Sequence, residues 1–225
     1  MIFFNIDGTL FDQENAEKLA AIRFFKENMA ILQLNQKEFI ALRDIYFNNP
    51  TLYLQKDLSM QERNRIIMRD LFGNHISNET ADQKTKEFIH LYKQHWIPFH
   101  DVIPCLEKLK SQNYNLGIIS NGDYDRQIDK LHRLGVKQYF DVFAISNEKS
   151  FNKPNKQIFL EACNAANIQP EQAYYISDNL VCDAIASKRY GMNGIWLNRK
   201  NRITYDDLDV IHSLNELINM IDCTK

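Results

Sequence analysis

The chain of 225 residues contains few of the residues that form turns, with only 7 glycines and 5 prolines. Average proteins contain about 7% glycine and about 5% proline, which is more than twice the share found here. We therefore expect few tight turns and several long helices.

The 4 cysteines are scattered along the sequence and show no paired spacing. They indicate neither a disulfide framework nor a zinc site, because both usually require closely spaced pairs. A reduced, cytoplasmic setting is the expectation that follows. The cysteines are Cys105, Cys163, Cys182 and Cys223.

The sequence also lacks long apolar runs and blocks of one charge. No apolar stretch approaches the roughly 18 residues of a membrane helix, and the N-terminus lacks the pattern of a signal peptide. Lys and Arg number 27 against 29 Asp and Glu, without a basic block. Because nucleic-acid binders usually carry a basic patch, we expect no membrane and no nucleic-acid polymer as a partner, and a monomer or homodimer.

Residues 13–96 carry almost only helical patterns. Their apolar residues recur at the spacing of an amphipathic helix. Two helix starts are marked by a capping residue with an acid three positions later, Asn35 with Glu38 and Ser59 with Glu62. This segment is therefore predicted to be mostly helical.

Strand patterns lie at residues 2–4 and in the part of the chain after Pro98, where they alternate with helical patterns. This alternation predicts an α/β fold with a doubly wound parallel sheet. Ligands of such folds bind outside the carboxyl ends of the strands. The later strands are predicted at 115–119, 142–145, 173–176 and 194–197, with helices between them and a last helix capped by Ser213 with Glu216.

Polar side chains gather directly after these predicted strands. Each alone is typical of a turn or a helix start, but their shared place at successive strand ends predicts one site. Carboxylates suit a divalent cation such as Mg²⁺, while a hydroxyl, turn N–H groups and an ammonium suit phosphate oxygens. The candidate residues are Asn5, Asp7, Ser120, Asn121, Lys153, Asp178 and Asp183.

These residues resemble the four motifs of the haloacid dehalogenase (HAD) superfamily, in the same order. Its first motif, Asp-x-Asp-Gly-Thr, is matched by residues 5–9 except at the first position, which is Asn5. The resemblance implies a catalytic core at 1–12 and 100–225 and an inserted all-helical cap at 13–99. The runs 116–121 and 153–159 are most similar to the pyrimidine 5'-nucleotidase-like branch.

The resemblance also implies a Mg²⁺-dependent phosphomonoester hydrolase that forms an aspartyl-phosphate on a small phosphorylated metabolite, such as a nucleoside monophosphate. The residue at position 5 is then the nucleophile and, with Asp7, Asp178 and Asp183, surrounds the metal. Asp7 is also the expected acid and base, Lys153 offsets charge, and Asp183 orients a metal-bound water or Lys153. Ser120, Asn121 and Lys153 are the expected substrate-binding residues.

The nucleophile position, however, holds Asn5, whose amide oxygen is a poor nucleophile. Loss of a covalent nucleophile can cost on the order of 10⁴ to 10⁶ in rate, so the chain as written is predicted to be inactive. Two interpretations remain open: an Asp→Asn change in an active phosphatase, or a natural pseudophosphatase that binds a phosphorylated ligand. We favour the first, because every other catalytic position is present.

Two further classes fit less well. A haloacid dehalogenase would share the fold, the nucleophile and the lysine, but those enzymes lack an acid two positions after the nucleophile, where this chain has Asp7. A dinucleotide-binding domain would need a G-x-G-x-x-G run after the first strand, and none is present.

Overall fold

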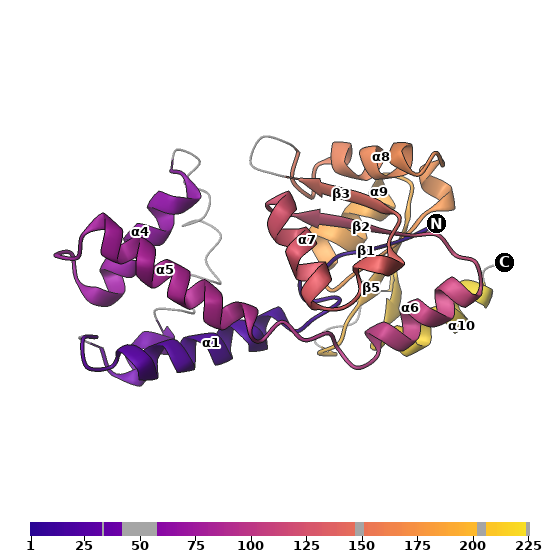
Figure 1. Cartoon of the computed structure of the whole chain (residues 1–225). Coiled ribbons are helices and arrows are strands. Elements are labelled where there is room, and N and C mark those ends of the chain that lie inside the picture. Colours follow the sequence, from indigo (N-terminus) through magenta and orange to yellow (C-terminus); the bar gives the residue numbers. More distant parts are fainter. Residues whose placement is uncertain (33, 42–57, 147–150, 202–205, 224–225) are drawn as a thin grey trace. The chain divides into compact units, whose positions relative to one another are not determined.

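The computed structural model of the chain describes residues 1–32, 34–41, 58–146, 151–201 and 206–223 (Figure 1). The chain forms two compact units. The core unit comprises Met1–Gln13 and Trp96–Lys225, and the helical unit comprises Glu14–His95. The predicted boundaries at 13 and 99 lie within a few residues of this division, while the role of the helical unit as a cap stays a prediction.

The core unit contains one sheet of six strands, all parallel, in the order β3-β2-β1-β4-β5-β6. The first strand is short and fully buried, as a strand covered on both faces must be. The predicted α/β class with a doubly wound parallel sheet is confirmed. The strands are β1 Ile2–Phe4, β2 Leu116–Asn121, β3 Val142–Ser146, β4 Tyr174–Ser177, β5 Asn193–Leu197 and β6 Asp209–Ile211.

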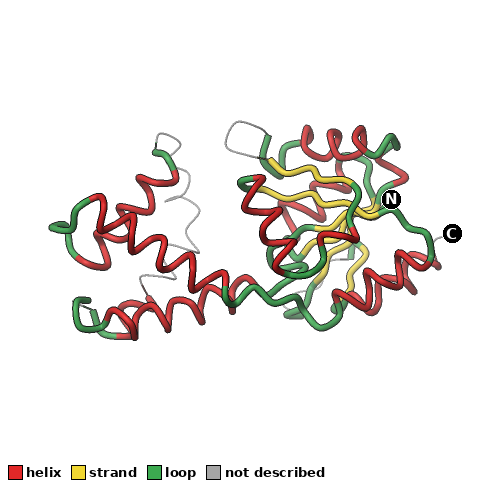
Figure 2. Tube along the Cα trace, viewed as in Figure 1, coloured by secondary structure: helices red, strands yellow, loops and turns green. Residues whose placement is uncertain are grey.

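Helices cover both faces of this sheet, as Figures 1 and 2 show. One face carries α8 and α9, whose side chains share a hydrophobic core with Phe3 and Tyr175. The other face carries α6, α7 and α10. The bounds are α6 Val102–Ser111, α7 Tyr124–Arg133, α8 Lys156–Ala165, α9 Ala186–Arg189 and α10 Leu217–Cys223.

Strand register determines where the site lies. Phe4, the last residue of β1, pairs with Ile118 of β2 on one side and with Ile176 of β4 on the other. β4 ends one residue beyond this level, at Ser177, and β2 continues three residues beyond it, to Asn121. The residues after β1 and β4 therefore meet the last residues of β2 at one edge of the sheet. The strand order runs outward from β1 to β3 on one side and from β4 to β6 on the other. The switch point therefore lies between β1 and β4, which is where folds with this strand order bind ligands.

Two elements of the core unit differ from the predicted pattern. The sixth strand, Asp209–Ile211, was not predicted, because it begins with an aspartate and lacks the continuous apolar run that marked the equally short strand at 2–4. The helix predicted after the fourth strand begins as a π-helical segment, Leu180–Ile185, and continues as α9. The last helix begins with a 3-10 turn, Leu214–Glu216, whose N-cap is Ser213, as predicted.

The described part of the helical unit consists of helices packed around phenylalanine rings. Phe24 of α1 contacts Phe72 of α4 and Phe88 of α5 edge to face, at 5.8 and 5.6 Å between ring centres. Residues 42–57 of the predicted cap lie outside the described residues. The helices are α1 Gln13–Asn28, α4 Met60–Phe72, α5 Asn78–Lys93 and one that starts after Asn35.

Both predicted helix starts of this unit are confirmed. The side chains of Ser59 and Glu62 form reciprocal hydrogen bonds with each other's backbone N–H groups. Asn35 and Glu38 form the same pair of contacts.

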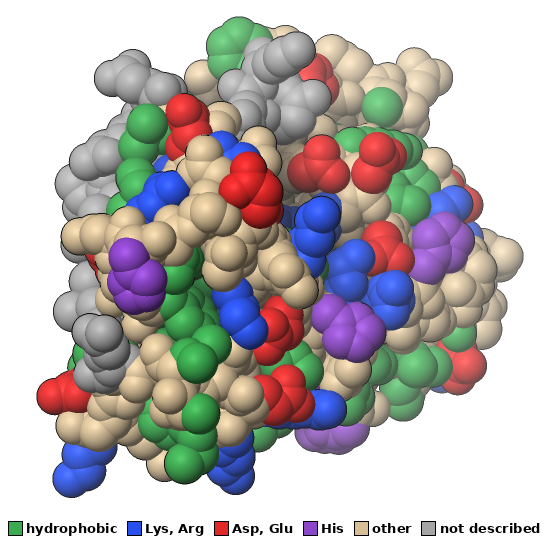
Figure 3. Space-filling model, turned by 60° about the vertical axis from the view of Figure 1, so that its left-hand side comes forward, with side chains coloured by type: hydrophobic (Ala, Val, Ile, Leu, Met, Phe, Trp, Pro, Cys, Tyr) green, Lys and Arg blue, Asp and Glu red, His purple; other side chains and the backbone are tan. Residues whose placement is uncertain are grey.

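Acidic and basic side chains are interspersed on the face drawn in Figure 3. Within the described ranges, no helix has the length and apolar character needed to cross a membrane.

Candidate active site

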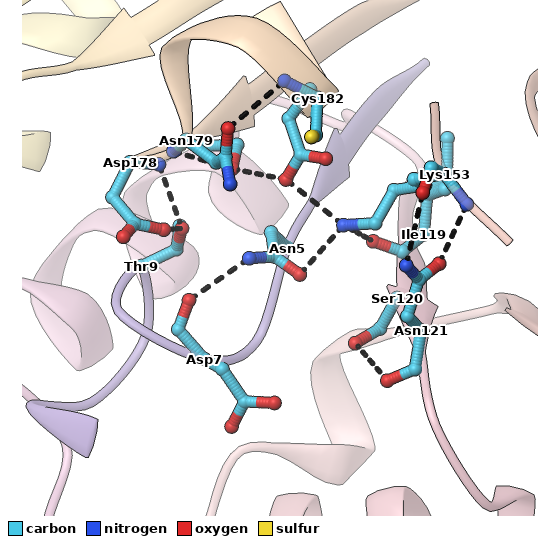
Figure 4. Close-up of polar contacts among 12 residues, drawn as sticks. Asn5, Asp7, Thr9, Ile119, Ser120, Asn121, Lys153, Asp178, Asn179 and Cys182 are labelled. Atoms are coloured by element: carbon cyan, nitrogen blue, oxygen red, sulfur yellow. Dashed lines mark hydrogen bonds and ion pairs between the residues drawn. The ribbon is translucent and has the colours of Figure 1, made fainter. Parts of the chain in front are cut away.

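Asn5 lies at the centre of the site, directly after β1 (Figure 4). Its backbone N–H donates to the carbonyl of Ile176 at 3.0 Å, which fixes it beside β4. Its side-chain Nδ2 donates to the main-chain carbonyl of Asp7 at 2.9 Å, and its Oδ1 accepts from Lys153 Nζ at 3.0 Å. The buried amide thus has a partner at each end.

Lys153 reaches this point from the loop after β3, and its side chain is only 5% exposed. Its ammonium donates to Asp183 Oδ2 at 2.9 Å and to the Tyr175 hydroxyl at 2.8 Å, in addition to Asn5. The loop is held by Asn121, whose Oδ1 accepts from the backbone N–H of Lys153 at 2.8 Å. The predicted substrate ligand Asn121 therefore directs its side chain to this loop.

Asp183 faces Lys153 and the inside of the sheet domain. Its Oδ2 accepts a hydrogen bond from the Ser177 hydroxyl at 2.5 Å besides the bond from Lys153, and the Tyr175 hydroxyl lies 3.2 Å from it. The expectation for Asp183 was an interaction with a metal-bound water or with Lys153, and the structure places it on Lys153. Burial and the neighbouring Asp183 raise the pKa of the Tyr175 hydroxyl, so this hydroxyl stays protonated.

Asp178 occupies the opposite side of Asn5 and is bound by the first motif. Thr9 Oγ1 donates to Asp178 Oδ1 at 2.9 Å and accepts from the Asp178 backbone N–H at 3.1 Å. Gly8 has a φ of +72°, and a Cβ there would lie 2.1 Å from Asp178 Oδ2, so only glycine fits. Burial raises the pKa of Asp178, and nearby Asp183 adds to this effect.

Asp7 directs its carboxylate away from the Asn5 amide (Figure 4), and its partners are side chains of α7. Its Oδ1 forms an ion pair with Lys130, and its Oδ2 accepts from Gln127 Nε2 at 3.2 Å. Burial alone would raise the pKa of Asp7, but Lys130 and Gln127, with Arg126 nearby, outweigh it and lower the pKa. Asp7 is therefore ionised at neutral pH in this arrangement.

Ser120 lies buried at the end of β2. Its hydroxyl accepts from Gln127 Nε2 at 3.2 Å, so one amide group contacts both Ser120 and Asp7. The structure thus brings the predicted residues together in two groups. One contains Asn5, Lys153 and Asp183, and the other contains Ser120 and Asp7. The hydrogen bond from the Asn5 side chain to the Asp7 carbonyl joins them. Among the residues that the structure describes, no three His, Cys, Asp or Glu side chains converge to form a metal site by themselves.

Sequence reasoning missed three residues that contact the predicted ones. Gln127 and Lys130 share a helix face with Leu131 and are buried with it, so they interrupt an apolar stripe with polar groups. That interruption was a usable signal, because buried polar residues require partners. Tyr175 carried no such signal, since an aromatic residue in a buried strand is ordinary.

A family model described as haloacid dehalogenase-like hydrolase matches residues 2–197. This match spans most of the chain, and a curated relative is 30% identical over 96% of it. The chain therefore belongs to the haloacid dehalogenase-like hydrolases. The superfamily membership predicted from the four motifs is confirmed.

That relative is the glyceraldehyde 3-phosphate phosphatase of Methanothermobacter thermautotrophicus, of which 98% is covered. The N-acylneuraminate-9-phosphatase of Homo sapiens is 26% identical, over 99% of this chain and 94% of the relative. Among solved structures, the magnesium-bound HAD-hydrolase YfnB of Bacillus subtilis superposes with a TM-score of 0.77 at 18% identity, covering 98% of this chain and 97% of that one. At that identity the likeness is one of fold.

Proposed function

We propose that this chain is built as a Mg²⁺-dependent phosphomonoester hydrolase that works through an aspartyl-phosphate, and that Asn5 makes it inactive as written. The observation that carries the proposal is the contact between Lys153 Nζ and Asn5 Oδ1 at 3.0 Å. An ammonium beside the nucleophile position can offset the negative charge that gathers between an attacking carboxylate and a phosphoryl group.

The neighbouring groups support the same reaction. The Ser120 hydroxyl and the turn N–H groups at the end of β2 would donate hydrogen bonds to the phosphoryl oxygens. Asp7, which is ionised in the substrate-free site, would take up a proton as the phosphate dianion approaches. It would donate that proton to the leaving oxygen and then accept one from the attacking water. An aspartate at position 5 would attack phosphorus, and the P–O bond to the leaving oxygen would break.

A divalent cation fits the donor set around Asn5. The Asn5 Nδ2 donates to the Asp7 carbonyl at 2.9 Å, so an aspartate there would place two oxygens against each other without a proton between them. A cation would remove that repulsion, and hard cations such as Mg²⁺ prefer carboxylate and carbonyl oxygens. Asp178, whose Oδ1 already accepts from Thr9 on the other side of Asn5, would be the further ligand. When bound, Mg²⁺ would neutralise charge on the phosphoryl oxygens.

The substrate class that we propose is a small phosphorylated metabolite. The two curated relatives described above are named for glyceraldehyde 3-phosphate and N-acylneuraminate 9-phosphate. Our more specific inference from the motif runs is a nucleoside monophosphate, and we infer a cytoplasmic setting from the scattered cysteines. A screen of phosphomonoesters against the Asn5→Asp variant, nucleotides first, tests this step; preference for a phosphosugar would overturn the nucleotide assignment only.

The restoring substitution Asn5→Asp tests the reaction itself. We expect hydrolysis of p-nitrophenyl phosphate with Mg²⁺ to rise by on the order of 10⁴-fold over the chain as written, because a covalent nucleophile is regained. The matched control is Asn5→Asp combined with Lys153→Met, which should stay near the unsubstituted rate. Absence of any gain in a folded Asn5→Asp protein would sink the phosphatase assignment.

The second candidate is a pseudophosphatase that binds a phosphorylated ligand without turnover. It is favoured by one observation: both ends of the Asn5 amide are hydrogen-bonded, so asparagine is accommodated without a lost partner. Calorimetric binding of inorganic phosphate to the chain as written, together with an inert Asn5→Asp variant, would support it over the hydrolase.

A further inference from the structure

We propose that Lys130 is a positioning residue: it holds the carboxylate of Asp7 beside the phosphoryl-binding edge, and it is itself held by Phe11 and Trp96. This inference rests on the proposed function, in which Asp7 protonates the leaving oxygen. It assigns a catalytic consequence to a buried lysine that the proposed reaction does not otherwise use.

The first observation is the burial of the ion pair. The Lys130 side chain is 3% exposed, while that of its partner Asp7 is 26% exposed. A buried ammonium is costly unless it is paired and its surroundings compensate for lost water. The lysine is thus fixed on the inner side of Asp7, and the aspartate keeps access to the open edge of the sheet.

The second observation is the aromatic surround of the ammonium. Lys130 Nζ lies 5.1 Å from the centre of the Phe11 ring and 5.3 Å from that of the Trp96 ring. The two rings contact each other edge to face at 6.4 Å. Cations are attracted to ring faces at this distance, so the rings add a preferred position for Nζ to that set by Asp7.

The rings belong to the two connecting segments of the core unit. Phe11 lies just before the chain enters the helical unit, and Trp96 is the first residue after it returns. Phe11 forms β-bridges with Asp7 and with Pro98, which ties the two segments together. The ammonium of Lys130 therefore joins both segments to the Asp7 carboxylate.

The third observation is that α7 holds the two oxygens of Asp7 separately. Lys130 binds Oδ1, and Gln127, one turn earlier, donates to Oδ2 at 3.2 Å. The same Gln127 amide lies 3.2 Å from the Ser120 hydroxyl. Two-point binding fixes the rotation of the carboxylate next to the group proposed to hold the phosphoryl oxygens.

A purely structural ion pair would make a different prediction from a positioning one. Loss of a structural pair would lower stability and depress every turnover alike. Loss of a group that positions the proton donor would instead depress turnover most for leaving groups that need a proton. Substrates of similar shape but different leaving-group basicity therefore separate the two roles.

The experiment compares p-nitrophenyl phosphate with phenyl phosphate, whose leaving phenolate is more basic, in the Asn5→Asp protein. We expect Lys130→Met to lower kcat about 100-fold for phenyl phosphate and less than about 10-fold for p-nitrophenyl phosphate, with little change in KM. Lys130→Arg keeps the charge and should recover most of the phenyl phosphate rate. Equal losses on both substrates, or no loss on phenyl phosphate, would overturn the proposal.

Two further measurements cover the other outcomes. If Lys130→Met does not fold, Phe11→Leu removes one ring and keeps the ion pair; a selective loss of about threefold to tenfold on phenyl phosphate is expected, and an unselective one overturns the proposal. If Asn5→Asp is inert, the proposed function fails, and a crystal structure then decides the positioning role without any activity. The structure is that of Lys130→Met in the chain as written, or of Phe11→Leu if Lys130→Met does not fold. The Asp7 carboxylate should then leave Gln127 in Lys130→Met or shift from its place beside Gln127 in Phe11→Leu; an unmoved carboxylate contradicts the inference.

Discussion

The buried hydroxyl of Tyr175 helps to fix the position of Lys153 in the candidate site. Lys153 Nζ contacts this hydroxyl at 2.8 Å, and the hydroxyl in turn donates to the carbonyl of Ile119 at 2.9 Å. The ammonium is therefore anchored to the sheet as well as to Asp183. Such an anchor restricts Lys153 to the position beside Asn5, where charge would develop.

We expect Tyr175→Phe in the Asn5→Asp protein to lower kcat about 10-fold, because Lys153 loses one of its anchors while the ring still packs against Phe159. Steady-state kinetics with p-nitrophenyl phosphate measure this change. Tyr190→Phe is the matched control, since the Tyr190 ring packs against the same Phe159, and it should leave kcat nearly unchanged. Equal effects of the two substitutions would show that Tyr175 acts only through packing.

At the scale of secondary-structure elements, the sequence predicted most of the strands that position the site. Strand patterns followed by Asn5, Ser120 and Asp178 predicted the edge at which the candidate site lies, because alternating strands and helices imply a parallel sheet. The resemblance implied a contact of Asp183 with a metal-bound water or with Lys153, but the sequence did not decide between these two partners. A π-helical segment, Leu180–Ile185, turns Asp183 toward Lys153, and such a local irregularity has no reliable sequence pattern.

The particular atoms that α7 contacts were also beyond sequence reasoning. The pattern predicted the helix, which is observed as Tyr124–Arg133. Which oxygen of Asp7 meets Gln127 or Lys130, however, depends on the rotation of that helix against β1 and on side-chain rotamers. Both arise from packing between segments more than 100 residues apart in the sequence.

The capping box that begins α4 gives a prediction for a single element. We expect Ser59→Ala to lower the free energy of unfolding by about 1 kcal/mol, because the Glu62 backbone N–H loses its acceptor and the reciprocal contact is lost. Urea unfolding followed by circular dichroism measures the loss. Ser77→Ala, which removes the cap of α5 from the same unit, is the comparison, and we expect it to cost less than Ser59→Ala. A larger loss from Ser77→Ala would contradict the importance of the reciprocal bond.

At the scale of the whole core unit, one buried carboxylate joins distant parts of the chain. Asp101 accepts from Arg199 at 2.8 and 3.0 Å, from the Ser213 hydroxyl at 2.8 Å and from the Leu214 backbone N–H at 2.9 Å. Arg199 also donates to the carbonyl of Thr9 at 3.1 Å. The first motif, the connecting segment near residue 100 and the C-terminal part are thus held by one ion pair.

This network should make the free energy of unfolding fall at low pH. Burial alone would raise the pKa of Asp101, but Arg199 and the hydrogen bonds from Leu214 and Ser213 outweigh it and lower the pKa. A carboxyl with a lowered pKa in the folded state stabilises the protein above its unfolded-state pKa. That contribution is lost as the pH falls below about 3.8, the ordinary aspartate value, toward the folded pKa.

We therefore expect Asp101→Asn to lower the free energy of unfolding by about 3 kcal/mol at pH 7, since Arg199 is left buried without its anion. The difference between the two proteins should shrink as the pH falls from 4 toward 2, where the aspartate itself takes up a proton. Urea unfolding across this range measures both quantities. Asp141→Asn, at the exposed pair with Lys110, is the control and should change stability by no more than about 0.5 kcal/mol. A difference that stayed constant with pH would mean that Asp101 acts through its shape and hydrogen bonds, and that its charge contributes nothing to joining the three segments.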